Sequence, residues 1–141
     1  MHPMSDVTLR PCTAADHAFV LGVRREAFRT AGDPAEEAKA ERALASLPFS
    51  VVEAAGEPVG YISLVHADDH DVVHELAVDP AVQARGLGTS VLRRVQEEAR
   101  GRGVPVRLSV HDDNPARRLY ERLGFAVTRV DGIRVRMEWR P

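Results

Sequence analysis

The sequence is poor in cysteine and aromatic residues, with one Cys and 5% Phe, Trp and Tyr in 141 residues. Because Cys12 is the only thiol, an internal disulfide is excluded, and a reducing, cytoplasmic location is the simpler expectation. No run of eighteen apolar residues occurs, and the first ten residues lack the pattern of a secretory leader. We therefore expect one domain over residues 1–141, with neither secretion nor a membrane-spanning segment.

An excess of one charge is also lacking, because 19 Lys and Arg side chains nearly balance 21 Asp and Glu side chains. The formal net charge of −2 gives no overall attraction to nucleic acid or to an anionic membrane. Internal repeats and low-complexity segments are absent too. The composition therefore predicts a compact domain, and its charge alone indicates neither a membrane nor a nucleic-acid partner.

Hydrophobic periodicity and capping signals predict the order β-α-α-β-β-β-α-β-α-β-β. Thr13 and Asp16 have the spacing of a capping box, and Asp33 before Pro34 is typical of a second helix start. The tripeptide 56–58 is expected to connect a hairpin. The predicted helices end near residues 29, 46, 100 and 123, and the predicted strands cover 7–11, 49–55, 59–65, 72–78, 104–110 and a terminal pair that meets at 131–132.

Residues 76–90 are the most informative stretch, because an apolar strand stops there before a glycine-containing turn and a helix. Gly86 and Gly88 allow a ligand to approach the backbone, and the first N–H groups of a helix have no acceptors within it. The helix dipole and Arg85 add positive charge, so the stretch predicts a phosphate site. A plain strand-to-helix connection is the alternative for this motif alone, and neither the dinucleotide pattern nor the P-loop is matched.

Two motifs together resemble the GNAT superfamily of acetyltransferases. Gln83, Gly86 and Gly88 meet the pattern Q/R-x-x-G-x-G/A directly after a strand. Residues 114–125 are similar to the family helix A-x-x-L-Y-x-x-x-G-F, which is matched by Ala116, Leu119, Tyr120, Gly124 and Phe125. The resemblance covers about residues 49–139. It implies a single-domain α/β (α+β) fold, with a mostly antiparallel seven-stranded mixed sheet that is splayed in the middle, four flanking helices and a cofactor-binding core near 72–125.

The resemblance also implies an activity, the direct transfer of an acetyl group from acetyl-CoA to a primary amine in a ternary complex. The strand before the turn would contact the pantetheine arm, and backbone N–H groups of the turn would bind the pyrophosphate. Asn114 stands six residues before the family tyrosine, where the commoner pattern has seven, so a helix cap is its alternative role. The implied cofactor-binding residues are Leu76, Ala77, Val78, Gln83, Ala84, Arg85, Gly86, Leu87, Gly88, Thr89 and Asn114.

Tyr120 and Glu75 are the predicted catalytic residues. A phenol with the usual pKa of about 10 stays protonated at neutral pH and can donate to a departing thiolate, although a core aromatic is the alternative reading of Tyr120. Glu75 lies on the strand beside the implied cofactor cleft and could accept the proton of the attacking amine. His74 is its rival, and because side chains alternate along a strand, only one of the two is expected to face the cleft.

The His- and Asp-rich segment 66–74 invites a metal interpretation, but it has no recognised ligand spacing, so we predict no metal. As a loop near the acceptor mouth, its acidity would favour a cationic amine, either a small molecule or a peptide. Two other functions are considered: a non-catalytic acyl-CoA-binding module and a toxin-like enzyme that acetylates aminoacyl-tRNA, against which the acidic composition argues. The acyl group, the exact amine and a homodimer through the terminal strands remain open.

Overall fold

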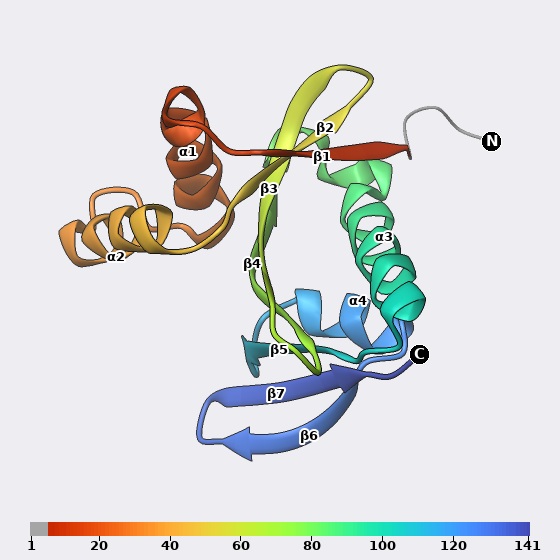
Figure 1. Cartoon of the computed structure of the whole chain (residues 1–141). Coiled ribbons are helices and arrows are strands. Elements are labelled where there is room, and N and C mark those ends of the chain that lie inside the picture. Colours follow the sequence, from red (N-terminus) through yellow and green to blue (C-terminus); the bar gives the residue numbers. More distant parts are fainter. Residues whose placement is uncertain (1–5) are drawn as a thin grey trace. The chain divides into compact units, whose positions relative to one another are not determined.

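The computed structural model describes residues 6–141, without the side chains of residues 83–85. Over this range the chain forms seven strands and four α-helices in the order that the sequence predicts (Figure 1). Short 3-10 turns at Ala14–Asp16 and Pro80–Arg85 precede two of the helices. The strands are β1 (Val7–Pro11), β2 (Ser50–Ala54), β3 (Glu57–His66), β4 (Asp71–Val78), β5 (Val106–His111), β6 (Ala126–Asp131) and β7 (Arg134–Trp139), and the helices are α1 (His17–Phe28), α2 (Pro34–Ser46), α3 (Leu87–Arg102) and α4 (Ala116–Arg122).

The seven strands of the described range form one sheet in the order β1-β2-β3-β4-β5-β7-β6. β4 pairs with β5 in parallel, over a register that runs from Asp71–Val106 to Val73–Leu108. The pairs β1–β2, β2–β3, β5–β7 and β6–β7 are antiparallel. The predicted mixed, mostly antiparallel sheet with four helices is therefore confirmed.

The chain divides into two compact units. The first comprises the described residues up to Leu64 together with Glu75–Ser90, and the second comprises Val65–His74 and Val91–Pro141. β3, β4 and α3 each contribute residues to both units. The expectation of one domain over residues 1–141 stays a prediction.

In the first unit, α1 and α2 lie side by side (Figure 1) and are joined by the ion pairs Arg24–Glu36 and Arg25–Glu37. The start of α2 follows from its sequence. The Asp33 carboxylate accepts hydrogen bonds from the backbone N–H groups of residues 35 and 36, and proline at the first helical position has no N–H to satisfy. The predicted cap and both predicted ends of this helix are confirmed.

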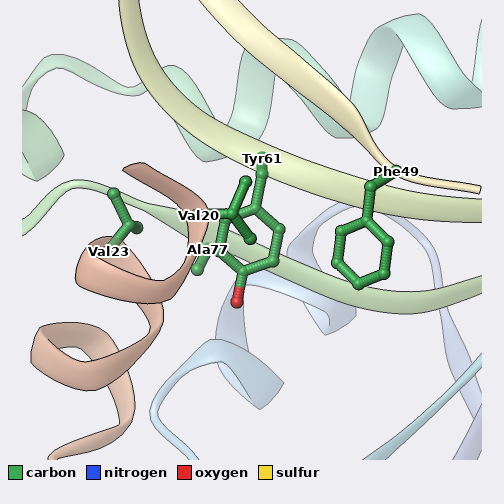
Figure 2. Close-up of a cluster of buried hydrophobic side chains, with 5 residues drawn as sticks. All are labelled: Val20, Val23, Phe49, Tyr61 and Ala77. Carbon is green, nitrogen blue, oxygen red and sulfur yellow. The ribbon is translucent and has the colours of Figure 1, made fainter. Parts of the chain in front are cut away.

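A cluster of buried side chains forms the core of the first unit (Figure 2). Val20 and Val23 come from α1, Phe49 precedes β2, Tyr61 comes from β3 and Ala77 from β4. The rings of Phe49 and Tyr61 lie 5.7 Å apart between centroids and are tilted by 39°. Because burial of a large apolar side chain contributes roughly 1.5–3 kcal/mol, this cluster holds α1 against the sheet.

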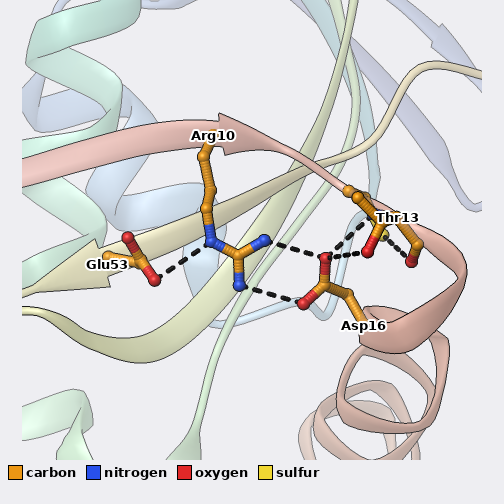
Figure 3. Close-up of polar contacts among 5 residues, drawn as sticks. Arg10, Thr13, Asp16 and Glu53 are labelled. Carbon is orange, nitrogen blue, oxygen red and sulfur yellow. Dashed lines mark hydrogen bonds and ion pairs between the residues drawn. The ribbon is translucent and has the colours of Figure 1, made fainter.

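Polar contacts fix the entry to α1 (Figure 3). The Asp16 carboxylate accepts a hydrogen bond from the Thr13 backbone N–H at 2.8 Å, which confirms the predicted capping box. Arg10 of β1 donates to Asp16 at 2.8 and 2.9 Å and to Glu53 of β2 at 3.0 Å. The hydrogen bonds from Arg10 and Thr13 hold the pKa of Asp16 below its usual range.

The hairpin predicted here is present, but the predicted connection at 56–58 begins one residue and ends two residues too late. The turn lies at Ala55 and Gly56, whose φ angles are 52° and 80°, and β3 begins at Glu57. Two consecutive positive φ angles are the signature of the two-residue turn whose twist matches that of paired strands. Pro58 is accommodated inside β3 opposite Glu53, where the register with β2 shifts.

In the second unit, α3 presents an apolar face that is completely or almost completely buried, at Val91, Leu92, Val95 and Ala99. On α4 the Tyr120 ring is buried and meets Phe125 edge-on at 5.8 Å. The hairpin of β6 and β7 turns at residues 132–133, one position beyond the predicted meeting point. Its exposed apolar side chains are Val127, Val130 and Ile133.

Candidate functional site

The predicted phosphate turn lies between β4 and α3 in the first unit. The Asp79 carboxylate accepts a hydrogen bond from the Ala81 N–H at 3.0 Å and so starts the 3-10 turn Pro80–Arg85. Gly86 then adopts a left-handed conformation with φ 70° and ψ 22°, and its carbonyl accepts from the Ser90 N–H of α3 at 3.2 Å. Since side chains are strained at this φ, a glycine at position 86 is explained by the backbone itself.

The backbone at Gly86 is open. A Cβ atom placed there would have no heavy atom within 4 Å, so a substituent would project into free space and not into the protein. Leu87 is fully buried and anchors the first turn of α3, while Gly88 and Thr89 are half-buried. The N–H groups of a helix's first turn have no acceptors within the helix, so this turn suits an anion. Gln83, Ala84 and Arg85 are also predicted to bind the cofactor, but their side chains lie outside the described part of the structure.

The end of β4 is held tightly against β3 within the first unit. A Cβ atom at Gly60 would lie 2.4 Å from the Ala77 carbonyl oxygen, so only glycine fits there. The Asp79 N–H donates to the Val59 carbonyl at 2.7 Å, directly after the strand. Ala77 and Val78 are buried and Leu76 is half-buried. The predicted pantetheine-binding strand therefore has a fixed backbone.

Glu75 lies in a polar cluster of the first unit. Its Oε1 accepts hydrogen bonds from the Tyr61 hydroxyl at 2.5 Å and from Arg24 Nε at 3.0 Å. Arg24 also donates from Nη2 to the Glu36 carboxylate at 3.0 Å and from Nη1 to the Glu36 carbonyl at 3.3 Å. The side chains of Arg24 and Glu75 are only 11% and 17% exposed, so these contacts are shielded from water.

Burial and charge set the protonation of this cluster. Burial, followed by the charge of Glu75 and its hydrogen bond, raises the pKa of Tyr61 well above its usual value, so the phenol is a permanent donor. Burial alone would lower the pKa of Arg24, but the hydrogen bond to Glu36 and the charge of Glu75 outweigh it and raise that pKa. Both donors to Glu75 therefore keep their protons at neutral pH.

A shallow depression, open to solvent and without enclosed room for a water molecule, lies beside this cluster. Arg24 and Glu75 form its polar part, and the rest of its lining is apolar: Val20, Ala40, Ala43, Leu44 and Phe49. All of these residues belong to the first unit and come from α1, α2, the segment before β2 and β4. The depression brings Glu75 together with the helices that the sequence left without a role.

The sequence analysis gave no role in the site to three residues of this cluster, Arg24, Tyr61 and Glu36. One signal was available: Arg24 stands four residues after Val20 and next to Val23, so a charge lies on the apolar face of an amphipathic helix. Tyr61 carries no such signal, because aromatic residues are common in strands. The partner of Arg24 is 51 positions away in the chain, and periodicity cannot reveal it.

In the second unit, burial raises the pKa of Tyr120, so its phenol is protonated at neutral pH. Asn114 accepts a hydrogen bond from the Ala116 N–H at 2.9 Å and stands one residue before Pro115, which occupies the N-cap position of α4. This contact occupies its amide oxygen and leaves its predicted role in cofactor binding a prediction. The rival base His74 is exposed on β4.

The His- and Asp-rich segment forms hydrogen bonds and not a ligand cluster. Asp71 accepts from His66 Nδ1 at 2.8 Å and from Arg102, and His70 pairs with Asp69 at 2.7 Å. In the part of the chain that the structure describes, no three His, Cys, Asp or Glu side chains are grouped as metal ligands. Within residues 6–141, no helix combines the length and the apolar character needed to cross a bilayer.

Comparison with known proteins gives one family match, the Acetyltransferase (GNAT) family, over residues 16–125. An N-alpha-acetyltransferase RimI of Mycobacterium tuberculosis is 36% identical over 127 residues, which are 84% of this chain and 78% of the relative. A mycothiol acetyltransferase of Nocardia farcinica is 31% identical over 134 residues, which are 89% of this chain and 43% of the relative. The chain spans between 23% and 43% of the length of the first three curated relatives that it matches.

Among solved structures, the chain is similar to the PaiA N-acetyltransferase of Thermoplasma acidophilum in complex with coenzyme A. The TM-score is 0.75 at 21% identity, over 96% of this chain and 99% of the other. At this identity the likeness concerns the fold, and it agrees with the strand order and helices described above.

Proposed function

Because the chain belongs to the GNAT family of acetyltransferases, we propose that it is an N-acetyltransferase that moves an acetyl group from acetyl-CoA to a primary amine. The family predicted from the two sequence motifs is confirmed. The single observation that carries the proposal for this chain is the turn at Gly86. There an open, left-handed backbone leads into the first turn of α3, which suits the pyrophosphate of coenzyme A.

Acetyl-CoA would supply the acetyl group as a thioester, and the first unit carries most of the residues proposed to bind it. Backbone groups of Leu76–Val78 on β4 contact the pantetheine arm, and backbone N–H groups of residues 84–89 hold the pyrophosphate. The close packing of β4 against Gly60 of β3 supports this assignment, since a preorganised strand loses little entropy on binding. Asn114 stays a proposed contact through its amide nitrogen.

The chemical step needs two proton transfers. The amine attacks the thioester carbon, so that a C–N bond forms and the C–S bond breaks. Glu75 accepts the proton that the amine loses, and Tyr120 donates a proton to the sulfur that leaves. Backbone amides near Val78 stabilise the charge that develops on the carbonyl oxygen. The products are an N-acetyl amide and free coenzyme A, and no covalent enzyme intermediate is required.

Thiol release from acetyl-CoA in the presence of a panel of amines tests the proposal. Tyr120→Phe keeps the buried ring but removes the acid, so we expect kcat to fall about a hundredfold or more. Wild-type binding of acetyl-CoA without turnover on any amine would favour the non-catalytic binding module. Absence of binding would contradict the proposed role of the turn.

Gly86→Glu should weaken binding of acetyl-CoA about tenfold or more, because it adds strain and a negative charge where the phosphates are expected. Gly103→Glu is the matched control. Gly103 directly follows the last residue of α3, has a φ of 68° and, like Gly86, has open space around it. The control carries the same strain and the same added charge away from the turn. An equal loss of affinity in both variants would contradict the assignment.

A cytoplasmic location and a homodimer are further proposals. Cys12 is a single thiol without a partner for an internal disulfide, which supports a reducing compartment; it is half-buried, and burial raises its pKa. The exposed Val127, Val130 and Ile133 on the terminal hairpin support self-association through β6 and β7. Light scattering on the wild type and on Val130→Lys tests the dimer, which should dissociate in the variant.

A further inference from the structure

The second unit carries an arginine-rich surface on the strands β5, β7 and β6 (Figure 1). Side chains alternate along β5 and β7, so that Leu108 and Met137 are buried on one side, and their neighbours Arg107 and Arg136 are exposed on the other. Register partners point to the same side of a sheet, which adds residues of β6. The members of this arginine face are Arg107, Arg129, Asp131, Arg134, Arg136 and Glu138, and Arg140 joins it through an ion pair with Glu138.

The arginine face has surplus positive charge and is open to solvent. Its five arginines face two carboxylates, so its formal net charge is +3, in a chain whose formal net charge is −2. The four arginines that take part in ion pairs have side chains that are between 45% and 72% exposed. A dissolved ligand can therefore reach these guanidinium groups, and an anionic one is attracted to them.

Two arginines of this face stand opposite each other across β6 and β7. Arg129 is the register partner of Arg136, and like charges in this position repel each other. The Asp131 carboxylate pairs with both, with Oδ1 at 2.7 Å from Arg129 Nε and Oδ2 at 3.1 Å from Arg136 Nε. One negative charge therefore serves two positive charges, and a second carboxylate from outside would balance the group.

A second group of the same composition lies toward the end of β7. The Glu138 carboxylate is 2.7 Å from Arg107 Nε and 2.8 Å from Arg140 Nε. In the described range, Arg107 donates through Nε and not through its two terminal nitrogens, whose fork can bind a carboxylate at two points. Arg134 forms no ion pair with any residue that the structure describes. The face therefore offers three places for an added carboxylate.

The size of the arginine face suits one extended segment. Three strands and seven residues of β7 and its end cover roughly 10 Å by 20 Å. This is far less than the roughly 800 Å² that each partner contributes in a stable complex of two folded proteins. On the side of β4 negative charge returns, since a hydrogen bond with His70 and, more weakly, the charge of Arg107 lower the pKa of Asp69. A long or broad anion would therefore extend beyond the positive surface.

Nucleic acid and lipid fit this face less well than an acidic peptide does. Trp139 is the one Phe, Tyr or Trp of the three strands, and it is buried on the other side, so bases have no ring to stack on. The exposed Val127 and Val130 have Met137 and Val135 as register partners and so lie on the other side too. The arginine face thus has no large apolar group to insert into a bilayer.

We propose that the arginine face is a docking surface for an acidic, extended segment of a partner protein. One carboxylate of that segment binds each pair of arginines that shares Asp131 or Glu138, and a third binds Arg134. Three added negative charges bring the face to neutrality. The inference goes beyond the proposed acetyl transfer and does not rest on it.

Fluorescence anisotropy with a labelled peptide tests the proposal. The peptide alternates four glutamates with four serines, and its neutral counterpart has glutamine in place of every glutamate. A labelled thymidine oligonucleotide with four phosphates carries the same charge. We expect saturable binding of the acidic peptide that weakens at least fivefold between about 20 and about 200 mM salt. The neutral peptide should not bind, and the oligonucleotide should bind more weakly than the acidic peptide.

Two variants with a matched control assign the binding to this face. Arg134→Glu reverses a charge without breaking an ion pair of the described residues, so the acidic peptide should bind at least fivefold more weakly. Arg93→Glu is the control, because Arg93 is exposed on α3, forms no ion pair with the described residues and gives the same change in net charge. Asp131→Asn removes a shared carboxylate and should strengthen binding at least threefold, a gain that a damaged fold would not produce.

The outcomes decide between this partner and the others. Absence of saturable peptide binding at low salt, equal losses in Arg134→Glu and Arg93→Glu, or weaker binding by Asp131→Asn would overturn the inference. Tighter binding of the oligonucleotide than of the peptide, lost in Arg134→Glu, would make the face a nucleic-acid site and overturn it as well. The assays contain no acetyl-CoA, so a failure of acetyl transfer leaves their result unchanged, and a failure of docking leaves thiol release unchanged.

Discussion

Glu75 and Asp71 lie on the same strand, β4, and each is paired with an arginine of a helix, Arg24 of α1 and Arg102 of α3. The Asp71 side chain is completely buried, and both of its oxygens are used, one by His66 and one by Arg102. Its backbone N–H donates to the Pro105 carbonyl at 2.9 Å. Asp71 is therefore bonded on every side by its own unit.

Glu75 differs from Asp71 in that its side-chain hydrogen bonds end on one carboxylate oxygen and not on both. Both hydrogen bonds that the described residues make to it end on Oε1, and the side chain lies beside the depression that is open to solvent. Its arginine is shared with a second carboxylate, whereas Arg102 and Asp71 balance each other in charge. A carboxylate whose two oxygens are both used by its own unit stabilises the fold, whereas a carboxylate bonded through one oxygen beside a solvent-open depression is consistent with the base proposed for Glu75.

The largest expected effect tests this difference at Glu75. Glu75→Gln keeps the size of the side chain and an oxygen for Tyr61 and Arg24, but removes the base and the charge. We expect kcat/KM for the amine to fall about a hundredfold or more, with little change in the denaturation midpoint. Steady-state kinetics at saturating acetyl-CoA and urea denaturation measure the two quantities. A variant that loses stability but retains its activity would show that Glu75 is structural and is not the base.

Asp71→Asn should have the opposite profile. Breaking the pair leaves Arg102 without its counter-charge, although Arg102 is partly exposed, so we expect a loss of about 2 kcal/mol in the free energy of unfolding. The value of kcat/KM per folded molecule should stay within about twofold. If the activity fell as in Glu75→Gln, the comparison between the two carboxylates would be wrong.

The stabilisation by Asp71 should also depend on pH. Burial would raise its pKa, but hydrogen bonds from Arg102 and His66 outweigh burial and hold the pKa below the usual value. A carboxyl group with a lowered folded pKa stabilises the protein above its unfolded pKa of about 3.9, and this is lost as the pH falls through the folded value. Urea midpoints of wild type and Asp71→Asn should therefore differ at pH 6 and converge below about pH 4. A constant gap would contradict the assignment.

The sequence predicted most of the fold, because the elements depend on local signals. The cap at Asp33, the apolar stripe of α3 and the terminal hairpin are all encoded by neighbouring residues. The hairpin itself was predicted, but its turn was placed too late, because alanine rarely adopts a positive φ and Gly56-Glu57-Pro58 offered a more conventional turn. The position of the phosphate turn was predicted from a motif, and the structure adds the left-handed Gly86 and its open surroundings.

The surroundings of Glu75 could not be predicted in the same way. Its partners come from α1 and β3, and its arginine is shared with a carboxylate of α2. The sequence shows neither which helix face meets β4 nor how many carboxylates share one arginine. The buried position of Arg24 in an apolar stripe was the one available clue. Long-range polar contacts of this kind depend on tertiary packing, which one sequence does not reveal.

The smallest expected effect concerns Tyr61, which touches the cluster through a single hydroxyl. Tyr61→Phe keeps the ring against Phe49 but leaves Glu75 held by Arg24 alone, so we expect kcat to fall severalfold and the protein to lose about 1 kcal/mol of stability. Val23→Ala is the control, since Val23 belongs to the same buried cluster and its truncation should cost stability without changing kcat. If both variants lost stability and neither changed kcat, Tyr61 would only be a core residue. A lower kcat in Tyr61→Phe alone, with an unchanged KM for acetyl-CoA, would mean that its hydroxyl positions the carboxylate that takes the proton.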